Sequence, residues 1–299
     1  MIPCGSIIDE LMTQMDNPRG TADEVYTKQV KEKLNEAYRD VCGAFNWTCL
    51  QQAATLTDQS YILPADCRTV LRVQDEDKQP YNFMPGGSRP SNFEKNWYYD
   101  TPVETALADG TTLAINEYMT AASSTAEFPA TTCAGEFIRI GSNTGIYKIA
   151  TWTSTSAITL SDRFRGYNQS AAMFQIRPKG TPILAFCDST GTALTPTGIV
   201  VTYVRFPLPL FRDEDIIELP GYAPAVKVQA LRKLLAMKGF NQAADRKEGE
   251  YLAALSEMKA SEPQNNAQFQ PTPMFRTRYT TAGSSTGSYI RGLNLINNG

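Results

Sequence analysis

The spacing of apolar residues changes twice along the chain, and this change limits the fold more than any single motif. Near both ends apolar side chains recur every three or four residues, as on one face of a helix, whereas in the middle they alternate. This pattern predicts an α+β protein in which a small β domain is inserted into a helical core. We expect the core to combine residues 1–73 with 181–262.

The first part of the core is predicted to hold a helix pair. Residues 6–15 form an amphipathic stripe with Ser6 as its N-cap. Thr21 and Glu24 form a capping box for a second helix, because each side chain can satisfy an amide of its first turn. The apolar face of this second helix is expected to consist of Val30, Leu34, Ala37, Tyr38, Val41 and Phe45.

From Leu50 the period becomes two, which predicts a β-hairpin made of residues 54–57 and 61–63. Residues 69–73 predict another short strand.

Residues 74–110 are rich in proline, glycine and aromatic side chains, and we expect a long loop. Such a loop is uncommon in a compact domain unless it packs on a neighbour or binds something. Exposed aromatic rings favour a protein interface; stacking on sugars or bases is the alternative, which the lack of a basic stripe disfavours. The expected contacts with another subunit or protein are Tyr81, Phe83, Phe93, Trp97, Tyr98 and Tyr99.

Residues 111–180 predict the inserted domain. Short alternating strands at 137–140, 147–149, 158–160 and 174–176 are separated by turn sequences. Strands of this length and spacing are typical of a small closed barrel or a sandwich. No polar residues converge in it.

Two acidic sequences beyond this domain could be mistaken for sites. Asp188-Ser189-Thr190-Gly191 is similar to the aspartic-protease turn, but its glycine lies one residue too late and no second copy completes a dyad. We expect a hairpin turn between paired strands at 183–186 and 199–204. The acids in 212–215 lack the alternating oxygen ligands of a Ca²⁺ loop, so we expect a solvated turn.

An αα-hairpin is predicted to complete the core. Pro224 suits the first turn of a helix, Lys238-Gly239 is a C-terminal signal, and Asn241 can cap the second helix. The expected buried residues are Val228, Leu231, Leu234, Leu235, Tyr251, Leu252, Leu255 and Met258.

Residues 263–299, called the arm below, contain three arginines and no acid. Alone the arm cannot bury enough apolar surface to fold, so we expect it to extend over another subunit or protein. Arginine and tyrosine are favoured residues at the centre of protein interfaces. The candidate contacts with that neighbouring protein are Phe269, Met274, Phe275, Arg276, Arg278, Tyr279, Tyr289, Ile290 and Arg291.

Composition limits the chemistry that is possible. The chain has no histidine, which rules out Ser-His and Cys-His nucleophile pairs and zinc sites with histidine ligands. Its six cysteines include no C-x-x-C pair, so we expect free, mostly buried thiols in a reducing compartment. There is no signal-peptide pattern and no run of the ~18 apolar residues that a membrane span needs. We expect no enzyme, metal, cofactor or membrane contact.

Several weak motifs follow one another in a characteristic order. They are Tyr61-Ile62-Leu63-Pro64-Ala65-Asp66, the block 138–166, the stretch 203–210, Glu218-Leu219-Pro220, and the helical hairpin with Ala243-Ala244 and Tyr251. This order resembles the head-to-tail adaptor (connector) proteins of tailed bacteriophages, over about 1–73 and 111–262.

The resemblance implies a structural protein of the virion neck, assembled in the cytoplasm of the host bacterium. Twelve copies would form a ring between the portal protein and a tail or nozzle protein. The ring would line the DNA channel and touch packaged DNA only transiently and without sequence preference.

Two other function classes stay open. A host- or carbohydrate-binding tail component could use the β domain and the aromatic loop, although the helical ends and the lack of repeats argue against it. A carboxylate-only hydrolase would need two carboxylates ~5–9.5 Å apart, and nothing pairs candidates such as Glu117, Glu136 and Asp162. Direct reading of DNA would need a basic patch or recognition helix, and the net charge of −3 offers none.

Overall fold

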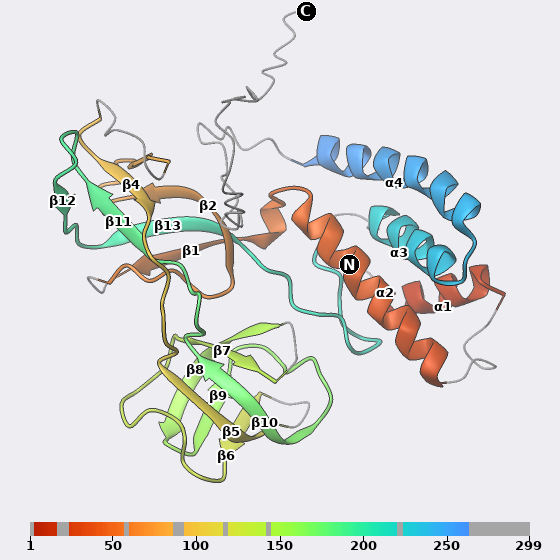
Figure 1. The fold of residues 1–299 in the computed structure, drawn as a ribbon, viewed down its shortest axis with the longest axis horizontal. Helices are drawn as coiled ribbons and strands as arrows, with labels where there is room; N and C mark the ends of the chain where they lie inside the picture. Colours follow the sequence, from red (N-terminus) through yellow and green to blue (C-terminus); the bar gives the residue numbers. More distant parts are fainter. Residues whose placement is uncertain are drawn as a thin grey trace, which may run out of the picture.

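The computed structural model describes residues 3–16, 24–56, 60–85, 93–115, 119–141, 145–219 and 224–262. Figure 1 shows a helical body, two small sheets beside it, and a closed barrel set apart from both. The prediction of an α+β chain, with a β-barrel between helices at either end, is confirmed.

The helical body brings both ends of the described chain together. Helices α1 (Cys4–Gln14) and α2 (Glu24–Gly43) pack with the hairpin of α3 (Pro224–Met237) and α4 (Asn241–Ser261). One continuous apolar core joins them, because each helix turns a buried stripe toward the others. This core includes Ile8, Leu11, Val30, Leu34, Tyr38, Val226, Leu234 and Leu255.

The N-termini of helices α1 and α4 are not capped by the side chains that the sequence predicted. Helix α1 begins at Cys4, and the amides of Cys4 and Gly5 donate to the backbone carbonyls of Asp215 and Asp213 (2.7 and 2.8 Å). Ser6 is therefore inside the helix rather than its N-cap. Helix α4 begins at Asn241 without a side-chain cap. The proposed Thr21 capping box lies outside the described residues.

The buried faces of the helical hairpin are also rotated from the predicted ones. Among the residues predicted to be buried in α3, only Leu234 is fully buried, whereas Ala225, Val226 and Ala230 are buried instead of Val228, Leu231 and Leu235. In α4, Leu252 is 56% exposed, whereas Leu255 lies in the core as predicted. Phe45 follows the end of α2 and lies edge-on to Trp47.

Two small sheets share a second core. The first has the order β1 (Gln51–Leu56), β13 (Ile199–Arg205), β2 (Cys67–Gln74), and the second the order β12 (Ala193–Leu194), β11 (Leu184–Cys187), β4 (Asn96–Tyr99), β3 (Asn82–Phe83). All neighbours are antiparallel except β3 and β4.

The predicted strand pairings in this region are wrong. Strand β1 pairs with β13 rather than with 61–63, because Tyr61 has a positive φ of 45° and Ile62 bridges to Ile183. Strands β11 and β13 belong to different sheets. The strands predicted at 69–73, 183–186 and 199–204 are present as β2, β11 and β13. The turn at Asp188 is also confirmed, where the Asp188 carboxylate accepts the amides of Thr190 and Thr192.

Residues 74–110 do not form a long loop. They contain β3, β4 and the start of the barrel, and the rings of Tyr81 and Trp97 are only 4% and 5% exposed within the subunit. Phe83 and Tyr99 pack on the same core, and Tyr98 is half-buried. Of the six aromatic residues expected at an interface, only Phe93 is exposed. The rings of Phe83, Trp97 and Tyr99 pack against one another within the subunit.

The barrel closes in the order β10-β5-β6-β9-β8-β7, so it has no open sheet edge. Its strands are β5 (Ala108–Ile115), β6 (Thr120–Ser123), β7 (Phe137–Ile140), β8 (Ile146–Ser154), β9 (Ala157–Leu160) and β10 (Gln169–Ile176). At its rim the Glu127 carboxylate accepts the amides of Thr111 and Thr112 (3.1 and 3.0 Å), beside Gly110, where a Cβ would meet the carboxylate.

The segments that lead into and out of the barrel, residues 103–107 and 176–181, are hydrogen-bonded to each other and form a paired stalk. The amide of Leu107 donates to the carbonyl of Ile176 (2.9 Å), and that of Val103 donates to Thr181 (2.9 Å). The amide of Gly180 donates back to Val103 (2.9 Å). The two connections therefore support each other where they leave the sheets.

Candidate functional site

Residues 206–219, which we call the strap, follow β13 in the chain and pack against both the barrel and the helical body. Leu208 is buried in the barrel core, whereas Leu210, Ile217 and Leu219 are buried in the helical core. Burying a leucine side chain contributes roughly 1.5–3 kcal/mol. One segment without helix or strand thus anchors two separate cores.

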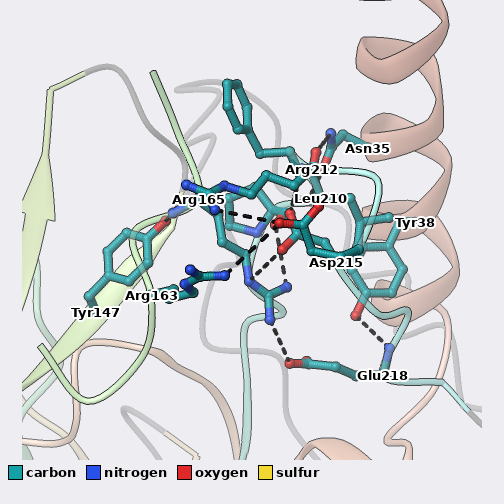
Figure 2. Close-up of polar contacts among 12 residues, drawn as sticks. Asn35, Tyr38, Tyr147, Arg163, Arg165, Leu210, Arg212, Asp215 and Glu218 are labelled. Atoms are coloured by element: carbon teal, nitrogen blue, oxygen red, sulfur yellow. Dashed lines mark hydrogen bonds and ion pairs between the residues drawn. The ribbon is translucent and has the colours of Figure 1, made fainter. Parts of the chain in front are cut away.

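Helix α2 holds the strap through three polar side chains on one face. The Asn35 side-chain amide makes the same two hydrogen bonds to Leu210 that a neighbouring strand would make. Its Nδ2 donates to the Leu210 carbonyl (2.5 Å), and its Oδ1 accepts a hydrogen bond from the Leu210 amide (2.7 Å). Lys31 donates to the Phe211 carbonyl (3.1 Å), and the Tyr38 hydroxyl accepts the amide of Glu218 (3.2 Å). Residues spaced by three or four positions lie side by side on a helix, which explains why α2 can follow the strap (Figure 2).

Arg165 reaches the strap from the barrel, just beyond β9. Its guanidinium lies 3.7 Å from Asp215 and 4.0 Å from Glu218, and its amide donates to the Tyr147 hydroxyl inside the barrel. Glu218 in turn binds Arg205 at 2.8 Å. Figure 2 shows these groups converging between the barrel and α2.

These charges are mostly removed from water. The Arg165, Arg205, Asp215 and Glu218 side chains are 11–20% exposed. Removing one partner from such a group leaves an uncompensated charge, which costs more than the pair contributes. The cluster therefore fixes how the barrel meets the helices.

The prediction that all the acids of 212–215 are solvated is wrong for Asp215. Its carboxylate accepts the amides of Phe211 and Arg212 (2.6 and 2.7 Å) and is only 11% exposed, because it closes a tight turn against Arg165. Asp213 and Glu214 are 47% and 63% exposed, as predicted. Within the described ranges there is no group of three or more acids or cysteines that could hold a metal ion.

A buried acid lies next to this cluster. Asp66 is 7% exposed, and its carboxylate accepts a hydrogen bond from the Tyr203 hydroxyl (3.3 Å). Burial raises the pKa of Asp66 to about 6, and the charge of Arg205 opposes that rise. This carboxyl is thus the titratable group of the junction nearest to neutral pH.

Two grooves flank the junction. The first, of about 490 Å³, separates β1 from barrel residues 135–137, and its wall carries the Glu136–Arg177 ion pair at 2.5 Å. The second, of about 360 Å³, separates α2 from the barrel near Tyr167. Glu136 is engaged by Arg177 and Asp162 is exposed, while Glu117 lies outside the described residues.

Sequence reasoning found few of these residues. Arg165 lies within the block 138–166 without any local sign of its role, and Asn35 carries no local signal either, because their partners lie far away in the chain. The candidate contacts in the arm, from Phe269 to Arg291, lie outside the described residues.

Comparison with known proteins does not assign a family. No family model matches the sequence, and a search of curated proteins finds no match either. Among the helices in the described ranges, none has the length and apolar character that crossing a membrane requires.

Proposed function

We propose that the chain is a structural subunit of a phage head-to-tail adaptor, which forms a ring between portal and tail and lines the DNA channel. The observation that carries the proposal is that the first helices and the last helices of the described chain form one helical body, with the barrel inserted between them in sequence. This is the order of elements that the resemblance implies.

The strap supports a mechanical role. A subunit placed between two other assemblies must keep its parts in a fixed orientation, and here the orientation depends on paired charges and on apolar anchors in both cores. Such buried pairs specify geometry more than they add stability. The net charge of −3 suits a channel that DNA passes without being held.

The arm would join the subunit to the portal. It begins after Glu262 at the end of α4, and it combines arginines with aromatic residues such as Phe275 and Tyr279. Deleting residues 264–299 should leave a folded chain that no longer binds portal rings. Replacing Ser284 by alanine in the intact chain is the matched control, and portal binding by the shortened chain would refute this role.

Ring formation is tested separately. Native mass spectrometry of the purified chain, or class averages of assembled particles, should show twelve copies. A stable monomer at high concentration, with or without portal, would contradict the proposal.

The binding-module alternative gains little support. Most of its aromatic candidates, including Tyr81 and Trp97, are used inside the subunit. Screening for hydrolysis of bacterial polysaccharides would test the enzyme alternative directly.

A further inference from the structure

The hydroxyl of Tyr203 faces two acceptors and has one proton to donate. Its oxygen lies 3.3 Å from Oδ1 of Asp66 and 3.3 Å from Oε1 of Gln52. A phenol donates a single hydrogen bond, so the two acceptors compete for it. Ionisation of Tyr203 does not remove this competition, because burial raises the pKa of Tyr203 well above that of an ordinary tyrosine. The hydroxyl can therefore serve only one of the two acceptors at a time.

These three groups connect the interior of the junction with its surface. Tyr203 and Asp66 are 2% and 7% exposed, so water replaces a lost hydrogen bond poorly at either of them. Gln52, on β1, is exposed and lines the groove of about 490 Å³ between the sheet and the barrel, together with Tyr203. A change at the buried acid can thus reach the wall of the groove through one hydroxyl.

Asp66 can gain or lose its proton near neutral pH. Its burial raises the pKa to about 6. Two cations face it and favour its ionised form, Arg205 from β13 and Lys148 from β8 of the barrel. The neighbouring thiol of Cys67 stays neutral, because burial raises its pKa as well. Asp66 is therefore the group that changes charge in this set.

We propose that Asp66, Tyr203 and Gln52 form a hydrogen-bond switch that is operated by the proton of Asp66. When Asp66 is protonated, its O–H donates to the Tyr203 oxygen, and the Tyr203 hydroxyl donates to Gln52. When Asp66 has released its proton to solvent, the Tyr203 hydroxyl donates to the carboxylate instead, because a hydrogen bond to a charged acceptor is roughly twice as strong as a neutral one.

The switch changes what the groove presents. With Asp66 protonated, Oε1 of Gln52 is engaged by Tyr203. With Asp66 ionised, this oxygen is released and accepts a hydrogen bond from water in the groove. The inference goes beyond the proposed function and does not depend on it, since it concerns one subunit by itself.

Titration of the full chain by carbon NMR tests the switch. In the unaltered chain, the signals of the Asp66 carboxyl and the Gln52 side-chain carbonyl should shift with a common midpoint near pH 6. Gln52→Met removes the acceptor that Tyr203 uses only when Asp66 is protonated, so the pKa of Asp66 should fall by roughly 0.4–1. Gln242→Met, at an exposed position of α4, is the matched control and should leave the pKa of Asp66 unchanged.

Tyr203→Phe should give the opposite sign. The carboxylate then loses its charge-assisted hydrogen bond, so the pKa of Asp66 should rise and the Gln52 signal should no longer follow the titration. Unchanged amide signals of α2 show that each variant is folded. A pKa of Asp66 that is equal in Gln52→Met and Gln242→Met would overturn the proposal, and so would a Gln52 signal in the unaltered chain that is constant from pH 5 to 7. Because Gln52 is exposed, this test stands even if Tyr203→Phe does not fold.

Discussion

Replacing Asn35 by alanine tests whether the strap depends on α2. The change removes both hydrogen bonds to the backbone of Leu210, a residue that is 1% exposed. Water reaches such groups poorly, so the Leu210 amide and carbonyl would each lose a partner at a cost of ~1–3 kcal/mol. Allowing for partial relaxation, we expect the free energy of unfolding to fall by about 2–4 kcal/mol.

Urea denaturation measures this loss. The midpoint should shift to lower urea while the slope stays constant, which indicates a change in stability alone. Gln29→Ala, an exposed position on the same helix, is the control and should stay within about 0.5 kcal/mol of the unaltered chain. If Asn35→Ala and Gln29→Ala have the same midpoint, the strap is held by its apolar anchors and the hydrogen-bond argument fails.

Three further outcomes are expected. Leu208→Ala should cost about 2–4 kcal/mol in thermal unfolding, because it leaves a cavity in the barrel core; an unchanged melting temperature would contradict this. The pKa of Asp66 is about 6 in the folded chain, above its usual 3.8, so the folded chain binds the proton more tightly than the unfolded chain does. The free energy of unfolding should therefore fall by up to about 3 kcal/mol as the pH rises from about 4 to 7. Asp66→Asn should abolish that fall in pH-dependent denaturation. Of the six cysteines only Cys49 has an exposed side chain, but partial desolvation of its thiol raises the pKa to about 11. Maleimide should therefore label Cys49 alone, and slowly, at pH 7. Rapid labelling of a second cysteine would be inconsistent with the fold.

Local periodicity was sufficient to predict the helices and the barrel. In α2, the stripe of Val30, Leu34 and Val41 is buried as predicted, because a helix makes its bonds within itself. The barrel strands follow one another with short turns, so neighbours in sequence are often neighbours in the sheet.

Strand pairing around β13 could not be predicted from local pattern. This strand lies between β1 and β2, and its residues face two cores, with Tyr203 in one and Val204 in the other. Its partners are far away in the chain, and a positive φ at Tyr61 prevents the hairpin that sequence proximity favours.

The junction was missed for a related reason. Residues 213–215 are all acidic and share the same local setting, yet only Asp215 faces Arg165, with its side chain 11% exposed. Burial of a charge depends on a partner from another part of the fold, and no pattern of neighbours records it. Asn35 similarly has an ordinary polar position on α2 until the strap is placed against it.

The paired stalk makes the barrel a removable module. Because the amide of Leu107 already lies 2.9 Å from the carbonyl of Ile176, the barrel can be cut out and the two ends joined by a short turn without moving the sheets. Its sheet is closed, so the excised piece would leave no strand edge unpaired, but the space that Leu208 of the strap fills in the barrel core would have to be filled by redesign. The same attachment point could carry a different domain, such as a fluorescent one.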